Sequence, residues 1–127
     1  MDWNKRDLEI LFQVKKIIKE LYKIKKPVYV NMNKVGNRLD KKHLLEKYLY
    51  KLPLTRKYLA DKLETREDYQ LRRINWACSF LLKEGLDISR WRVKRIAGIK
   101  SGYDDYIDEI IGEMKNAENR IFPENFR

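Results

Sequence analysis

Apolar side chains recur every three or four residues along most of the chain, which is the spacing of amphipathic helices. The first such segment covers residues 4–24, and Pro27 stops it. Residues 28–30 then form an extended stretch too short to make a sheet alone. The apolar stripe of this first predicted helix consists of Ile10, Val14, Ile17 and Leu21, with Leu11, Ile18 and Tyr22 beside it.

Capping signals divide the rest of the chain into six further helices. Asn31 and Asp40 are expected to cap the second and third, because their side-chain oxygens accept hydrogen bonds from first-turn N–H groups. Pro53 suits the first turn of the fourth helix, and Thr65 with Asp68 resembles a capping box for the fifth. These signals place helices at residues 31–39, 40–50, 53–63, 65–84, 89–97 and 104–115.

The ends of the fifth and sixth helices are marked by glycines, Gly85 and Gly98, which readily adopt the left-handed backbone of a helix C-terminus. Ser89 is expected to cap the sixth helix. The fifth helix is expected to bury Tyr69, Ile74 or the stem of Arg73, Trp76, Ala77, Phe80 and Leu81. In the last helix the inward residues are Tyr106, Ile107, Ile110, Ile111 and Met114.

The order long helix, turn, short capped helix, turn, helix occurs twice, with an offset of about 58 residues. The aligned pairs are Val28 with Leu86, Val30 with Ile88, Asn31 with Ser89, and Val35 with Val93. This repetition predicts an all-α fold of tandem helix-turn-helix modules packed as one compact helical domain. The expected modules are residues 1–63 and 64–117, followed by a loosely ordered tail at 118–127.

The net charge of +10 is unevenly distributed over the 127 residues. Residues 1–63 carry +10 and residues 64–100 carry +4, whereas residues 101–127 carry −4. A basic body of this kind favours a polyanion as the partner, because each phosphate that is neutralised releases condensed counterions. The alternative is a lysine-rich surface that only keeps the protein soluble.

One cysteine, Cys78, and one histidine, His43, exclude an intrachain disulfide and a zinc site built from this pair. Cys78 lies in the apolar run 76–82 and is expected to be a small buried hydrophobe. The chain shows neither an apolar signal region nor a run long enough to span a membrane. We therefore expect a cytoplasmic protein with no cofactor, no membrane contact and no small-molecule substrate.

Residues 89–100 are the most basic part of the second module. Helical geometry turns Val93, Ile96 and Ala97 inward and spreads the charged side chains over the outer surface. Arginine pairs bidentately with guanine edges or phosphates, so we expect this helix to contact DNA. The alternative is a solvated basic surface with a core tryptophan. The candidate DNA-binding residues are Arg90, Trp91, Arg92, Lys94, Arg95 and Lys100.

A second group of candidates lies in the first module. If residues 40–50 form the third helix of a helix-turn-helix, then Lys41, Lys42 and His43 enter the major groove. His43 is expected to make a polar contact, since no second titratable group is positioned to make it a catalyst. Bases would be read by some of Asn37, His43, Arg90 and Arg95. The remaining candidates for DNA binding are Asn31, Asn33, Lys34, Arg38 and Lys47.

The last predicted helix is acidic. Its carboxylates would repel phosphate, so the two modules cannot contact DNA in the same way. Carboxylates at helical spacing also bind metal in nucleases, but neither a lysine-containing nuclease motif nor a glycine-rich phosphate loop accompanies them. We therefore expect no catalytic residues and no metal. The acidic side of this helix is expected to be either a solvated surface or a docking surface for a basic partner. The residues concerned are Asp104, Asp105, Asp108 and Glu109.

Short motifs spread over most of the chain occur together in one family. They are Asp2-Trp3, Arg6-Asp7, Pro27-Val28, Leu52-Pro53, Thr55-Arg56, Tyr58-Leu59, Glu64, Gln70, Arg72-Arg73, Trp76-Ala77, Arg90-Trp91 and Ala97-Gly98. This set resembles the C-terminal region of the TnsD family (TnsD/TniQ group), the target-selection proteins of certain bacterial transposons. In that family a TniQ-like N-terminal part carries Cys/His metal ligands and recruits the transposition ATPase. The present sequence has no such ligands, so neither property is carried over.

The resemblance implies a helical module that recognises a defined chromosomal DNA target. The expected function is therefore non-catalytic, sequence-specific binding of double-stranded DNA for transposon target-site selection, with other transposition proteins as further partners. The alternative is a protein-interaction module that uses its acidic last helix. A third interpretation is a general nucleic-acid binder without sequence preference.

Overall fold

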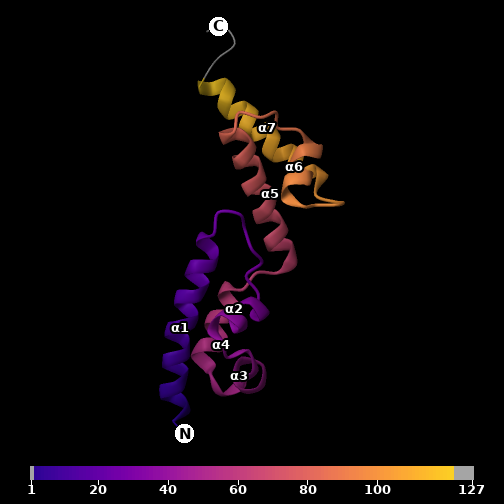
Figure 1. Ribbon diagram of the computed structural model, residues 1–127. Helices are drawn as coiled ribbons and strands as arrows, with labels where there is room; N and C mark the ends of the chain where they lie inside the picture. The colour runs from indigo at the N-terminus through magenta and orange to yellow at the C-terminus, as the bar shows by residue number, and fades with distance from the viewer. Residues whose placement is uncertain (1, 122–127) are drawn as a thin grey trace. The chain divides into compact units, whose positions relative to one another are not determined.

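The computed structural model describes the backbone of residues 2–121 and the side chains of residues 2–117 (Figure 1). All regular secondary structure in this range is helical, which confirms the predicted all-α class. The chain divides into two compact units, Met1–Tyr69 and Gln70–Arg127. The elements are α1 (Trp3–Lys23), α2 (Met32–Leu39), α3 (Lys42–Tyr48), the 3-10 turn η1 (Leu49–Lys51), α4 (Pro53–Lys62), α5 (Arg66–Lys83), α6 (Arg90–Ala97) and α7 (Asp104–Ile121).

In the first unit, α2 and α4 pack against the long helix α1 (Figure 1). The buried stripe of α1 includes Ile18 where the sequence pattern suggested Ile17, which is only partly buried. Both residues border the same apolar face, so the periodicity alone did not separate them. The buried core of the unit consists of Ile10, Val14, Ile18, Leu21, Val30, Val35, Leu45, Leu52 and Leu59.

The N-terminus of α4 is capped from α1, by a side chain 48 residues earlier in the chain. Asp7 is 2% exposed, and its Oδ1 accepts hydrogen bonds from the Thr55 N–H at 3.0 Å and the Thr55 hydroxyl at 2.7 Å. Its Oδ2 accepts from the Leu54 N–H at 2.9 Å. Helix N-termini leave N–H groups unpaired, and Leu52, the residue at the cap position, makes no side-chain cap hydrogen bond. Asp7 therefore replaces a local cap and joins α1 to α4.

The predicted role of Asp40 as an N-cap is wrong. Asp40 ends α2 in the left-handed conformation, with φ of 57°, and Lys41 precedes α3 without a side-chain cap. The two helices also approach closely, because a Cβ on Gly36 would lie 3.0 Å from the Lys42 Cα. Aspartate tolerates both cap roles, and here the tight turn between α2 and α3 selects the C-terminal one. The third helix also ends earlier than predicted, at Tyr48.

The second unit contains most of α5, which begins at the end of the first unit, together with α6 and α7 (Figure 1). The capping box of α5 is confirmed, since the Asp68 N–H donates to the Thr65 hydroxyl oxygen at 3.1 Å. The prediction that Phe80 is buried is wrong, because its side chain is 37% exposed and Cys78 takes the inward position. The buried core consists of Ile74, Ala77, Cys78, Leu81, Val93, Ala97, Ile99 and Ile107.

The last helix, α7, continues to Ile121, beyond the end predicted near Lys115. The predicted tail therefore overlaps α7 in part, and residues 122–127 lie outside the described residues. Within the part of the chain that the structure describes, no helix combines the length and the apolar character needed to cross a membrane.

Residues that the repeat alignment pairs occupy equivalent positions in the two short helices, α2 and α6. Asn31 and Ser89 are both N-cap residues with extended backbone. Asp40 and Gly98 both end their helices in the left-handed conformation. One difference is that the Asn31 side chain makes a cap hydrogen bond, whereas the buried Ser89 hydroxyl has no partner. The prediction for the Ser89 position was right, and the predicted cap bond is absent.

Candidate nucleic-acid interface

In the first unit, most of the predicted DNA-contacting side chains lie on the outer surface of α2 and α3. Asn31 and Lys41 are partly buried, and Asn31 has a structural role because its side-chain oxygen accepts the Lys34 N–H at 2.9 Å. Lys42 lies 3.9 Å from Glu46 in an exposed ion pair, which contributes little to stability. The exposed candidates are Asn33, Lys34, Asn37, Arg38, Lys42, His43 and Lys47.

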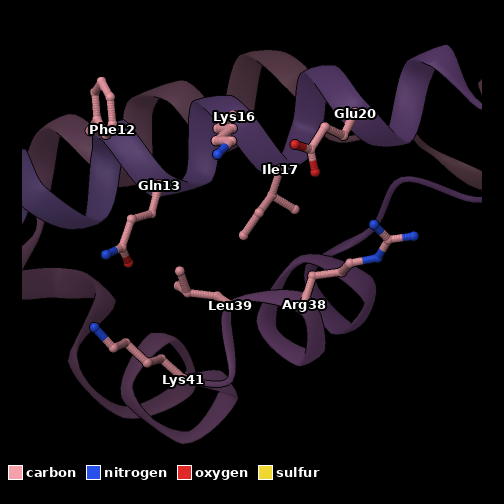
Figure 2. A pocket seen from close by; sticks show the side chains of 8 residues that line it. All are labelled: Phe12, Gln13, Lys16, Ile17, Glu20, Arg38, Leu39 and Lys41. Carbon is pink, nitrogen blue, oxygen red and sulfur yellow. The ribbon is translucent and has the colours of Figure 1, made fainter.

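An open groove of about 470 Å³ lies between α1 and the α2–α3 turn (Figure 2). In Figure 2, Ile17 extends from α1 toward Leu39, and these two side chains supply the apolar floor. Lys16, Arg38 and Lys41 line the groove together with a single carboxylate, that of Glu20, so the lining has a net positive charge. The structure thus places two predicted DNA-binding residues, Arg38 and Lys41, along the same groove as Lys16 of α1. The other lining residues are Phe12 and Gln13.

Sequence reasoning did not select Lys16 or Phe12. Both belong to the outer positions of the first amphipathic helix, where a charged or exposed residue carries no distinguishing signal. Phe12 is 74% exposed, and Leu8, one turn earlier, is 58% exposed. Only the packing of α2 against α1 shows that Lys16 and Phe12 border a groove.

Two basic side chains of α6 are paired with α7. The Arg90 Nε donates to Asp108 Oδ1 at 3.0 Å, and its Nη2 also contacts Asp108 Oδ2. The Arg90 Nη1 lies 3.9 Å from Asp104 Oδ2, and the Lys94 Nζ donates to Asp104 Oδ1 at 2.7 Å. Bidentate pairing of this kind matches the planar guanidinium to the carboxylate. Arg90 and Lys94 therefore form ion pairs within their own unit.

The same pairing perturbs both titrating groups. The hydrogen bond and the charge of Asp108 raise the pKa of Arg90 above its ordinary value. The hydrogen bond from Arg90 lowers the pKa of Asp108, against the opposing effect of desolvation. Each group therefore favours the charged form of the other.

Of the remaining candidates of the second unit, Trp91, Arg95 and Lys100 are exposed and Arg92 is partly buried. Trp91 is 59% exposed, so the alternative of a core tryptophan is wrong. The Arg92 guanidinium lies 5.2 Å from the Trp91 ring centre, and its Nη1 donates to the Asp87 carbonyl oxygen at 3.3 Å. Arg95, one turn after Trp91, is exposed, and so is Lys100.

The described residues offer neither a metal-ligand cluster nor an exposed thiol. No cluster of three or more His, Cys, Asp or Glu side chains within the described residues is placed to hold a metal ion. Cys78 is 1% exposed in the core of the second unit, as predicted, and burial raises the pKa of its thiol. A buried thiol with a raised pKa is a poor nucleophile.

Together, the fold and these surfaces define a basic helical protein of two small units, with a cationic surface on α2 and α3. Residues 1–59 match the family model of TnsD, described as Tn7-like transposition protein D. Over 97 residues, or 76% of this chain, the sequence is 35% identical to the Tn7 transposition protein TnsD of Escherichia coli. The chain spans 19% of that relative's length. No solved structure gives a significant match. The chain is therefore TnsD-like in sequence, which confirms the resemblance at that level.

Several residues that carry the resemblance stabilise the first unit. Asp7 and Thr55 form the buried cap of α4. Glu64 and Val30 form a two-bond link, in which the Glu64 side chain accepts the Val30 N–H at 3.0 Å and the Glu64 N–H donates to the Val30 carbonyl at 2.9 Å. The matched range 1–59 covers α1 to α3 and most of α4, so it falls within this unit. The similarity in these motifs therefore indicates a shared fold as much as a shared function.

Proposed function

We propose that this chain binds double-stranded DNA sequence-specifically, without catalysis, and thereby takes part in target-site selection during transposition. The similarity to a Tn7 transposition protein over 97 residues carries this proposal. The net charge of +10 supports it, because a basic surface gains affinity from phosphates through counterion release. DNA and other transposition proteins are the partners that we propose.

The first unit supplies the DNA-contacting surface that we favour. Its α2 and α3 are joined by the short turn at Asp40 and Lys41, and we propose that this pair of helices serves as the helix-turn-helix reader. Amide and imidazole side chains can pair with base edges in the major groove, and Asn37 and His43 are exposed on these helices. Exposed or partly exposed cations surround them and are proposed to contact phosphates. These cations are Lys34, Arg38, Lys41, Lys42 and Lys47.

The alternative of a protein-interaction module with an acidic docking surface is less favoured. In the acidic face of residues 104–113 on which this alternative depends, two of the five carboxylates, Asp104 and Asp108, are paired with Arg90 and Lys94 in the same unit. A basic partner would have to break these pairs before it could use the two carboxylates.

The test is fluorescence anisotropy with a duplex selected from a random library and a scrambled duplex of the same composition. Between about 50 and 200 mM salt, several phosphate contacts should weaken binding by orders of magnitude. Asn37→Ala should cost about 1–3 kcal/mol on the selected duplex and little on the scrambled one. Lys42→Ala should weaken both duplexes equally, and Lys57→Ala, an exposed change on α4, is the charge-matched control. Absence of binding at 50 mM salt, or equal binding to both duplexes, would overturn the proposal.

A further inference from the structure

The two sides of α6 present different chemistry, although basic residues lie on both. Arg90 and Lys94 are one helical turn apart and face the carboxylates of α7. Trp91 and Arg95 are also one turn apart, and both are exposed. Since positions four residues apart share one side of a helix, α6 has an inward cationic side, defined by its pairing with α7, and an outward side. Arg90 belongs to the inward side although its side chain is 51% exposed. The helix itself contains no acidic residue.

A DNA phosphate meets competing carboxylates on the inward side. It would compete with Asp108 for the Nε and Nη2 of Arg90, which are the groups that form a bidentate contact. It would also approach the Asp104 carboxylate, which lies 2.7 Å from the Lys94 Nζ and 3.9 Å from the Arg90 Nη1. Bringing like charges together in this way opposes binding. Arg90 and Lys94 are therefore poor phosphate ligands despite their charge.

The outward side lacks this obstacle. Trp91 offers an exposed indole, and the Arg92 guanidinium 5.2 Å from its ring centre adds positive charge beside it. The Arg95 side chain is exposed and forms no hydrogen bond or ion pair with any other described residue. A cation next to an aromatic ring suits a nucleic-acid backbone, where the cation meets phosphate and the ring packs on sugar or base.

We propose that the second unit contacts DNA through Trp91 and Arg95, and that α7 withholds Arg90 and Lys94 from the phosphates. This inference rests on the proposed DNA-binding function and assigns its residues within the second unit. The carboxylates of α7 thus set how many phosphates the unit neutralises. Arg90 and Lys94 act as positioning residues that hold α6 against α7.

The first experiment compares two carboxylate-to-amide changes on α7 by fluorescence anisotropy on one duplex over about 50–200 mM salt. Asp108→Asn should release Arg90 and add one phosphate contact, which makes the salt slope steeper by about 0.9. Over that fourfold salt range, the extra contact adds about a 3.5-fold loss of affinity. Glu109→Gln is the matched control, because it changes the net charge equally and Glu109 forms no ion pair with a described residue. Equal slopes for the two variants would show a bulk-charge effect and overturn the inference.

The second experiment removes cations from the two sides of α6. Arg95→Ala should weaken DNA binding and make the salt slope shallower by about 0.9, whereas Arg90→Ala should leave both unchanged. Trp91→Ala should weaken binding at an unchanged slope, because an indole contact releases no counterion. Lys83→Ala, at an exposed lysine of α5, is the charge-matched control, and far-UV circular dichroism verifies that each variant is folded.

The outcomes separate this inference from the proposed function. If the wild-type chain binds no duplex, the proposed function itself fails. If the wild-type chain binds but Arg90→Ala loses as much affinity as Arg95→Ala, only the assignment of the two sides is wrong. If neither Trp91→Ala nor Arg95→Ala changes binding, the outward side does not contact DNA, and the inference is overturned.

Discussion

Replacing Asp7 with alanine tests whether a buried carboxylate holds the first unit together. The Asp7 carboxylate accepts three hydrogen bonds from Leu54 and Thr55, at 2.7 to 3.0 Å, and Asp7 is 2% exposed. Hydrogen bonds to a charged group contribute about 1.5–3 kcal/mol each, and donors left unpaired in the interior cost about 1–3 kcal/mol. Loss of an N-cap alone costs about 1 kcal/mol. These contributions overlap, so we expect Asp7→Ala to lower the free energy of unfolding by about 3–5 kcal/mol.

A loss of this size is large compared with the roughly 5–15 kcal/mol that stabilises a typical domain. Asp7→Asn is the informative intermediate. Its amide keeps one oxygen for Thr55 but turns an NH2 group toward the Leu54 N–H, and two donors then face each other. We expect a loss of about 1–3 kcal/mol, because one acceptor is removed and the shape is kept.

The measurement is guanidinium chloride unfolding followed by the fluorescence of Trp3, in a background where Trp76 and Trp91 are replaced by phenylalanine. Trp3 lies in the first unit, 5.5 Å from the Tyr48 ring centre, so its signal reports that unit alone. Glu9→Ala removes an exposed carboxylate from the same helix and should change stability by less than about 0.5 kcal/mol. A loss below about 1 kcal/mol for Asp7→Ala would refute the assigned role of this cap.

Three further predictions concern the second unit. Gly98→Ala should destabilise the second unit by about 1–2 kcal/mol, because φ at this position is 74° and an added Cβ would lie 3.1 Å from the Arg73 Nη2. Thermal unfolding measures this loss, and an unchanged melting temperature would contradict the prediction. Cys78 should react with a thiol reagent only upon unfolding, since it is buried and its pKa is raised; rapid labelling of the native protein would contradict this. The pKa of Asp108 is lowered in the folded state by its pair with Arg90. The stabilisation from this pair is therefore complete above the ordinary aspartate pKa of about 3.9, and it is lost as the pH falls through the lower folded-state pKa. Asp108→Asn should therefore reduce the acid dependence of unfolding, and an unchanged dependence would argue against the pair.

The sequence by itself determined the helical class and most of the helix boundaries. Hydrophobic periodicity and capping act within one or two turns, so a local pattern is sufficient to place α1, α2 and α6. Where local chemistry allowed two outcomes, the prediction was wrong. Asp40 suits either end of a helix, and the close crossing at Gly36 decided between them. The width of the apolar face of α5 likewise left Phe80 ambiguous, and packing exposed it.

The candidate site, too, was predicted in part from the sequence and decided in part by the tertiary structure. Charge and spacing identified α6 and the α2–α3 region as basic, but they did not distinguish Arg90 from Arg95. That distinction depends on Asp108, 18 residues beyond Arg90, which only folding brings within hydrogen-bond distance. The cap from Asp7 to Thr55 spans 48 residues for the same reason. Pairing between distant side chains is set by the folded coordinates, and no local pattern encodes it.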